Sequence, residues 1–378
     1  MFFDSGNASQ RHLDSRSLDG DHDRIVAWNP NSLLERTLMN GRERILSLLA
    51  GQPIDRTPLM PITMMFAADH IGQPYGRYAS DHRVLVDAQL RVAEAYDFDY
   101  VSCISDPARE AADCGADVQL FEDQPPAIDE MNALLADKAR LQQLPPPDPA
   151  SPGRMRDRVQ AAALFREKAA GQRLIEGWTE GPCAEAADLR GINTLMMDFY
   201  DDPDFVHALF EWVLQLALRF ARAQVDAGVE LMGVGDAAAS LIGPQLYQDF
   251  VWAYEKRLVD GLHEMGCKVR LHICGNINSI LEPIGRLGCD IVDLDFPVPL
   301  AAARAAMGPQ PVLLGNLDPV RVLRDGTPET ITAAVAKCHQ EAGPRYIIGA
   351  GCEVPRGTPH ENLMALTRYA QSTSASTR

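Results

Sequence analysis

The residues with the clearest chemical potential are a histidine and two cysteines. His272 and Cys274 are separated by one residue in the segment RLHICGN, and Cys352 lies in GAGCEVP. Alternate residues of a β-strand point to the same side, so His272 and Cys274 can approach one ion together. An imidazole and two thiolates are typical ligands of Zn²⁺, and three protein ligands leave a fourth position for a substrate.

The same residue types also occur in ordinary protein interiors. A His-x-Cys pair is more often a packing feature than a metal site, because buried cysteine commonly behaves as a small apolar side chain. From spacing alone, zinc binding and ordinary packing therefore remain equally open for these three residues.

Polar side chains also follow most of the apolar runs that are typical of strands. They include Asp106, Glu180, Asp236, Asp295 and Asn316. In a barrel of parallel strands, active-site residues lie where the strands end and the following loops begin. Acids, a histidine and cysteines at so many of these positions therefore indicate an active site.

Eight short apolar runs alternate with longer amphipathic segments along the chain. The expected strands are Leu59–Met64, Tyr100–Ile104, Leu174–Gly177, Leu231–Val234, Val269–Ile273, Ile291–Leu294, Val312–Leu314 and Tyr346–Ile348. Parallel strands joined by crossover helices predict an α/β fold, a (β/α)8 TIM barrel. A doubly wound sheet is the competing interpretation, but no GxGxxG follows the first run.

The barrel is expected to form a catalytic domain over residues 38–372. Residues 1–37 are polar and aperiodic, so we interpret them as an N-terminal extension, and residues 373–378 as a C-terminal tail. A long stretch that includes QLPPPDPASPGR separates the second and third strands. We interpret this stretch as an insertion after strand two, over the barrel mouth, followed by a helix over Met155–Ala170.

The composition restricts the partners of the protein. With 35 Lys and Arg against 52 Asp and Glu, the 378 residues carry a net charge of −17, which disfavours binding to nucleic acid or to anionic membranes. No apolar run reaches the roughly 18–20 residues of a membrane helix, and no signal peptide is visible. Eight cysteines are too few for a disulfide scaffold in a chain of this length, so a cytoplasmic location is expected.

Several short motifs occur in a specific order. They are RERILSLLAGQPIDRTP, SDP, EGPCAEAADLRG, GDAAASLIGPQLYQDFVWAYEKRLVDGLHEMG, HICGN, VDLDFPV, LLGNLDP and GAGCEVPRGTP. From about Asn40 to about Tyr369, the chain resembles the uroporphyrinogen decarboxylase superfamily. Within it, the chain is most similar to the corrinoid-linked branch of methylcobamide:coenzyme M methyltransferases.

Two differences favour the methyltransferase branch over the decarboxylases. The decarboxylases carry an arginine-rich loop after the first strand that binds porphyrinogen carboxylates, whereas the corresponding segment here, MPITMMFAADHIG, has no arginine. They also lack the His-x-Cys pair and the distant cysteine with which the methyltransferase branch binds zinc.

The resemblance implies that His272, Cys274 and Cys352 bind zinc, with Asp295 as a fourth ligand when substrate is absent. A free thiol is mostly protonated at neutral pH, and coordination to zinc deprotonates it. The resulting thiolate would attack the methyl group of a methyl–Co(III) corrinoid and leave Co(I). The chain lacks the DxHxxG signature of a cobalamin-binding module, so methylcobalamin or a related corrinoid is expected on a corrinoid-binding partner protein.

Four further residues are assigned roles near the reacting groups. Asp106 and Asp236 are expected to face the cavity and to hydrogen-bond the corrinoid or a protonated group of the substrate, although a loop cap is equally open for Asp106. Glu180 is expected to act as an acid near the methyl acceptor, and Asn316 to supply an amide to the cofactor.

The methyl acceptor is expected to be a small thiol or tetrahydrofolate. Arg109, Arg190 and Arg356 lie on loops from which they could bind an anionic acceptor, but loop arginines are more often solvated. A homodimer is left open.

Three other functions remain open. The first is an O-demethylating or dehalogenating methyltransferase that loads a corrinoid protein. The second is a decarboxylase of the uroporphyrinogen decarboxylase type that acts on a different acid. The third is a corrinoid- or tetrapyrrole-binding protein without catalytic activity.

Overall fold

The computed structural model describes residues 38–374, so the expected N-terminal extension and the last four residues of the expected tail lie outside the described residues. The α-helices are α1 (Gly41–Leu49), α2 (Met65–His70), α3 (Tyr75–Ser80), α4 (His82–Ala95), α5 (Ala108–Cys114), α6 (Arg154–Ala169), α7 (Pro182–Arg190), α8 (Ile192–Asp201), α9 (Pro203–Ala227), α10 (Pro244–Leu246), α11 (Trp252–Glu264), α12 (Leu281–Gly285), α13 (Leu300–Met307), α14 (Pro328–Ala342) and α15 (His360–Ser372). The strands are β1 (Tyr100–Ser102), β2 (Val118–Gln119), β3 (Ala127–Ile128), β4 (Leu174–Glu180), β5 (Leu231–Gly235), β6 (Lys268–Ile273), β7 (Ile291–Leu294), β8 (Val312–Gly315) and β9 (Tyr346–Ile347).

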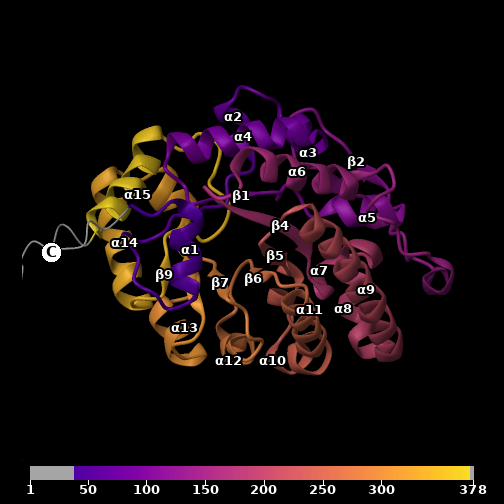
Figure 1. Ribbon diagram of the computed structural model, residues 1–378. Coiled ribbons are helices and arrows are strands. Elements are labelled where there is room, and N and C mark those ends of the chain that lie inside the picture. The colour runs from indigo at the N-terminus through magenta and orange to yellow at the C-terminus, as the bar shows by residue number, and fades with distance from the viewer. Residues whose placement is uncertain (1–37, 375–378) are drawn as a thin grey trace, which may run out of the picture. The chain divides into compact units, whose positions relative to one another are not determined.

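The main sheet is parallel throughout and curls on itself (Figure 1). Its order is β1-β4-β5-β6-β7-β8-β9, so neighbours along the chain are also neighbours in the sheet. The eighth position is filled by Leu59, which forms a parallel bridge with Ile348 and accepts a hydrogen bond from the backbone N–H of Asp99. The predicted TIM barrel is therefore confirmed.

The first expected strand, Leu59–Met64, is reduced to that single bridge. Pro58 and Pro61 flank Leu59 and have no backbone N–H, so this segment cannot form a regular ladder. It still closes the ring, because Met60 N donates to Ile348 O and Ile348 N donates to Pro58 O, at 2.9 Å each.

Helices surround the strands, as expected from their amphipathic patterns (Figure 1). The longest, α9, begins where the Asp202 side chain accepts a hydrogen bond from Phe205 N and Pro203 occupies the first turn. It ends at Gly228, which has a positive φ of 124°. No helix among the described residues is long and apolar enough to span a membrane.

The barrel interior changes in character from one end to the other. At the amino-terminal end of the strands, the apolar side chains of Ile45 and Leu48 from α1 pack against Leu174, Leu231 and neighbouring strand residues. Helix α1 therefore closes this end of the barrel with an apolar layer.

The middle of the barrel holds a charged layer. Arg270 of β6 is fully buried and pairs with Glu176 of β4 at 2.9 Å and with Asp293 of β7 at 2.6 Å. Because side chains alternate along a strand, residue 272 is the next to point inward from β6. The charged layer therefore lies directly beneath the carboxyl ends of the strands.

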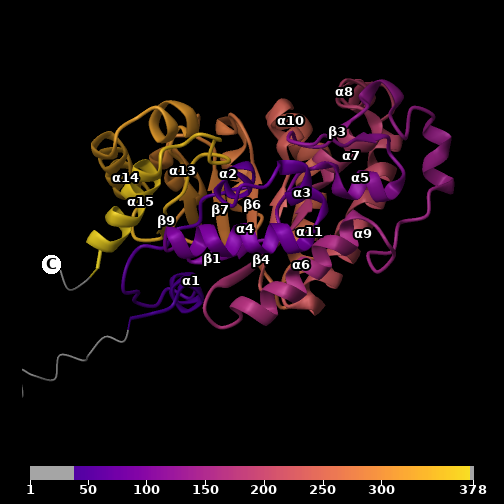
Figure 2. The ribbon, with the colours of Figure 1, turned by 90° about the horizontal axis from the view of Figure 1, so that it is seen from above.

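The expected insertion after β1 contains the β2–β3 hairpin and two short 3₁₀ turns. The backbone of this insertion forms hydrogen bonds of 2.9 Å with two helices (Figure 2): Gly76 N of α3 donates to Glu122 O, and Leu135 N donates to Leu189 O of α7. Helix α6 then follows over Arg154–Ala169, close to the predicted bounds.

Candidate metal centre and its cavity

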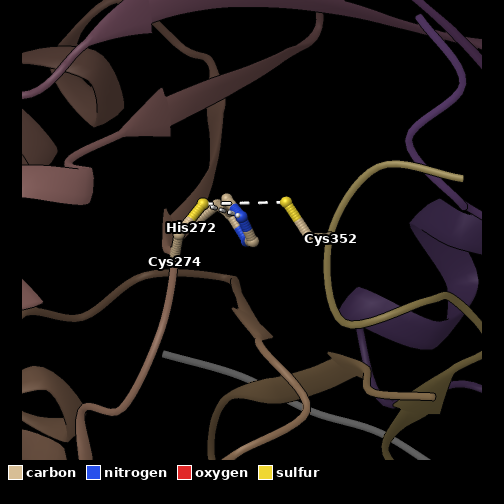
Figure 3. A group of neighbouring side chains, drawn as sticks. All are labelled: His272, Cys274 and Cys352. Carbon is tan, nitrogen blue, oxygen red and sulfur yellow. Dashed lines mark hydrogen bonds between the residues drawn. The ribbon is translucent and has the colours of Figure 1, made fainter. Parts of the chain in front are cut away.

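His272, Cys274 and Cys352 meet at the carboxyl end of the strands. The Nε2 atom of His272 lies 3.0 Å from the sulfur of Cys274, which lies 3.7 Å from the sulfur of Cys352. One ligand atom from each residue lies within 4.8 Å of the other two. Figure 3 shows Cys352 reaching toward the pair from the loop that follows β9, across the mouth of the barrel. The three residues could therefore coordinate a single ion.

Asp293 fixes the orientation of His272. The Nδ1 atom of His272 lies 3.1 Å from Oδ2 of Asp293, so its Nε2 atom faces the sulfurs. Asp293 is itself held by two hydrogen bonds from Arg270, at 2.6 and 3.1 Å. Metal-binding histidines generally donate their second N–H to a carboxylate or carbonyl, and this arrangement fits that pattern.

The electrostatics of the cluster favour a bound cation. The hydrogen bond from Cys274, together with His272, lowers the pKa of Cys352 to about 4, and the same contact raises the pKa of Cys274. Burial would lower the pKa of His272, but Asp293 and Cys274 raise it well above its ordinary value. Binding of a divalent metal ion would replace the protons that these groups share.

A cavity of about 150 Å³ lies against the cluster. Its lining residues are Ile62, Met64, Ile104, Asp106, Pro107, Arg109, Trp178, Glu180, Gly235, Ala237, His272, Cys274, Cys352 and Glu353. Glycines on β5 make room for side chains from β4, because a Cβ on Gly233 would lie 2.2 Å from the ring of Trp178. The cavity therefore combines apolar walls with a few polar groups and one face formed by the three candidate metal ligands.

Asp106 and Glu180 both line this cavity, as predicted, and both are tied to arginines. Asp106 pairs with Arg154 through two bonds of 2.7 and 2.5 Å, which outweigh its burial and lower its pKa. Glu180 accepts a hydrogen bond of 2.9 Å from Arg109. Burial nevertheless raises the pKa of Glu180 to about 8, so its carboxyl group is largely protonated at neutral pH.

Asp295, the expected fourth ligand, lies outside the group of ligand atoms that meet within 4.8 Å. Its carboxylate accepts hydrogen bonds of 2.7 Å from the backbone N–H groups of Gly275 and Phe296. Glu353, in contrast to Asp295, lines the cavity, and burial raises the pKa of Glu353 to about 7. The role of Asp295 as a ligand in the substrate-free state stays a prediction.

Asp236 and Asn316 do not line the cavity. Asp236 is completely buried and accepts hydrogen bonds from the backbone N–H groups of Cys183 and Ala184, at the start of α7. Asn316 donates to the carbonyl oxygens of Asp295 and Val298 and so holds the loop after β7. Asp236 therefore binds the start of α7 and Asn316 holds a loop, and their expected contacts with the corrinoid or the substrate stay predictions.

The three arginines expected on loops differ in their surroundings, and two of them lie on helices instead: Arg109 on α5 and Arg190 at the end of α7. Arg190 pairs with Asp198 at 2.7 Å, and Arg356 pairs with Asp69 and Asp123. Arg109 alone among them lines the cavity.

Sequence reasoning missed the charged layer and Trp178. Arg270 precedes His272 by two residues, and Asp293 is paired with His272 in the sheet register. The alternation of residues along β6 would have placed Arg270 below His272, and the pairing of β6 with β7 would have placed Asp293 beside it.

The chain is similar in sequence to known proteins over most of its length. The chain is 27% identical over 339 residues to the methylcobamide:CoM methyltransferase MtbA of Methanosarcina mazei, covering 88% of this chain and 97% of that protein. It is 25% identical to the uroporphyrinogen decarboxylase of Pseudoalteromonas atlantica, with coverage of 88% and 97%.

The fold also matches a solved structure. A methyltransferase from Methanosarcina mazei superposes with a TM-score of 0.80 at 20% identity, covering 88% of this chain and 98% of that one. The profile of the uroporphyrinogen decarboxylase (URO-D) family matches residues 40–373. The predicted resemblance is thus confirmed, and the chain belongs to the uroporphyrinogen decarboxylase family.

Proposed function

We propose that this protein is a zinc-dependent, corrinoid-linked methyltransferase that moves a methyl group between a methyl-corrinoid and a small thiol. The relatives named as methylcobamide:CoM methyltransferases support the general activity of a corrinoid-dependent methyltransferase. The observation that carries the zinc assignment is the meeting of His272, Cys274 and Cys352 at one wall of a cavity.

The donor set fits zinc. One imidazole nitrogen and two sulfurs are common zinc ligands, and a set of three leaves a position for a substrate. Asp293 holds the His272 ring with Nε2 toward the sulfurs, as a metal ligand requires. When bound, zinc would supply a Lewis acid that keeps a thiol deprotonated at neutral pH.

The dimensions of the cavity favour a small thiol over tetrahydrofolate. Its volume is about 150 Å³, whereas sites for drug-sized ligands are roughly 300–1,000 Å³. The apolar side chains of Ile62, Ile104 and Met64 would pack against the carbon chain of the thiol and exclude water from its sulfur. Arg154 would keep Asp106 ionised beside the bound substrate.

The corrinoid would be presented by a partner protein. A corrinoid ring is far larger than this cavity, so it would approach the open end of the barrel rather than enter it. The sequence lacks the DxHxxG signature of a cobalamin-binding module, which agrees with a separate corrinoid protein.

A decarboxylase acting on a porphyrinogen is less well supported. Arg109, which lines the cavity, already contacts Glu110 and Glu180, so it is not free to bind the carboxylates of a substrate. The segment after the first strand supplies no additional arginine.

Metal analysis combined with a methyl-transfer assay tests the proposal. We expect about one zinc per chain in the wild type and a large loss in Cys352→Ser. Cys338→Ser is the matched control, because Cys338 lies on α14 outside the cluster. Transfer from methylcobalamin to 2-mercaptoethanol and to tetrahydrofolate would be followed through the absorbance of the corrinoid.

The results separate the alternatives. Zinc retained in Cys352→Ser, or methyl transfer that survives complete removal of zinc, would contradict the assignment. Transfer to tetrahydrofolate but not to the thiol would contradict the choice of acceptor.

A further inference from the structure

The arginine that lines the cavity, Arg109, already has ionic and hydrogen-bonding partners. The guanidinium of Arg109 donates to Oε1 of Glu180 at 2.9 Å and lies 3.3 Å from Oε2 of Glu110. It also donates to the backbone carbonyl of Asp106, whose carboxylate is paired with Arg154. Arg109 is therefore not free to pair with an anionic substrate unless it gives up these partners.

Two uncharged hydrogen-bonding atoms face the same corner of the cavity. An ideal Cβ built on Gly235 would lie 3.1 Å from Oε2 of Glu180 and 3.1 Å from the indole Nε1 of Trp178. The backbone of Trp178 forms hydrogen bonds with the side chain of Gln224, whereas its indole N–H has no acceptor within residues 38–374. A side chain at residue 235 would crowd both atoms, so the glycine keeps them open to the cavity that all three residues line.

The protonation of Glu180 agrees with a neutral corner. Burial raises the pKa of Glu180 to about 8, so at neutral pH Oε2 belongs to a carboxyl group rather than to a carboxylate. A protonated carboxyl group and an indole N–H suit a hydroxyl or carbonyl oxygen. That oxygen can accept a hydrogen bond from the indole N–H, and it can accept from the carboxyl group or, in a hydroxyl, donate to it.

We propose that Trp178, Glu180 and Gly235 form a subsite for an uncharged hydroxyl or carbonyl group of the thiol, so that the enzyme selects neutral small thiols. This inference rests on the proposed function, because it places the sulfur of the thiol at the metal ligands. It differs from the acceptor in the names of the relatives, since coenzyme M carries a sulfonate.

A sulfonate in this corner would face the indole of Trp178 and the carboxyl group of Glu180 rather than a free guanidinium. To pair with it, Arg109 would have to break its bond to Glu180, which would leave that buried carboxyl group without a partner. Burial of an unpaired charge is strongly unfavourable, whereas a hydroxyl group would be satisfied by the atoms already present.

A series of three thiols of similar length tests the inference. Binding of 2-mercaptoethanol, 1-propanethiol and 2-mercaptoethanesulfonate to the zinc-loaded full chain would be measured by calorimetry at pH 7. We expect 2-mercaptoethanol to bind about tenfold more tightly than 1-propanethiol, because its hydroxyl group forms an additional hydrogen bond in the corner. We expect 2-mercaptoethanesulfonate to bind more weakly than both. A sulfonate that binds as tightly as the hydroxyl compound would overturn the proposal.

Substitutions of Trp178 and Gly235 test whether this corner causes the preference for a thiol with a hydroxyl group. Trp178→Phe removes the indole N–H, so the affinity for 2-mercaptoethanol should fall to that for 1-propanethiol. Trp252→Phe is the matched control, because the indole of Trp252 donates to Pro283 on the outside of the barrel. Gly235→Ala fills the corner and should also remove the preference, which keeps the test available if Trp178→Phe does not fold.

The outcomes distinguish this inference from the proposed function. A protein that binds no zinc would contradict both. A zinc-loaded protein that binds thiols but keeps its preference for the hydroxyl group in both Trp178→Phe and Gly235→Ala would contradict the subsite alone.

Discussion

Replacing Asp293 by asparagine tests whether the buried carboxylate beneath His272 supports the metal centre. Asp293 lies 3.1 Å from Nδ1 of His272 and accepts two hydrogen bonds from Arg270, and all three side chains are buried. Asparagine keeps the size of the side chain and one acceptor, but it removes the negative charge.

The expected effects follow from these contacts. Removing one partner of a buried ion pair costs about 3–5 kcal/mol, and because asparagine retains an acceptor we expect a loss of about 3 kcal/mol in the free energy of unfolding. Loss of a carboxylate that orients a metal-binding histidine typically lowers metal affinity by about 10–100-fold. Urea unfolding would measure the first quantity, and competition with a chromophoric zinc chelator the second.

Glu176→Gln provides the control. Glu176 is the other carboxylate paired with Arg270, at 2.9 Å, and no hydrogen bond joins it to His272 among the described residues. We expect a comparable loss of stability, about 3 kcal/mol, with little change in zinc affinity. If both variants lost zinc equally, or if Asp293→Asn kept the wild-type affinity, the carboxylate would not act through His272.

Three further predictions concern packing, pH and metal. Gly233→Ala should destabilise the protein by about 1–3 kcal/mol in urea unfolding, because the added Cβ would lie 2.2 Å from the ring of Trp178; an unchanged stability would contradict the close contact. Burial raises the pKa of Glu180 to about 8, so the folded state keeps a proton that the unfolded chain loses near pH 4.5, and stability should fall as pH rises between these values. Glu180→Gln should remove that part of the pH dependence, and a profile identical to that of the wild type would argue against the raised pKa. Zinc at about 100 times its dissociation constant should stabilise the wild type by about 2.7 kcal/mol in thermal unfolding but should have little effect on Cys352→Ser.

The barrel and part of its site could be predicted because both depend on local patterns. Alternation along a strand placed His272 and Cys274 on one side, and the order of the motifs placed Cys352 near them. The predicted first strand is longer than the observed one. The prolines near Leu59 have no backbone N–H, so this segment lacks donors that a strand ladder needs.

The roles of Asp236 and Asn316 could not be predicted from position alone. A carboxylate after a strand can face the cavity or bind the first N–H groups of a neighbouring helix, and the two choices look identical in sequence. Asp236 binds α7 because Gly181 allows a close approach: a Cβ there would lie 2.5 Å from the Asp236 side chain. Such proximity between distant segments becomes visible only in the folded chain.

The position of Cys352 also affects when the three proposed metal ligands can come together during synthesis. Cys274 and Cys352 are separated by 78 positions, and the second sulfur comes from the loop that follows the last strand. A nascent chain that has emerged only as far as β8 holds His272 and Cys274 but not the third ligand. His272, Cys274 and Cys352 can therefore come together only after β9 and the loop that follows it have been synthesised.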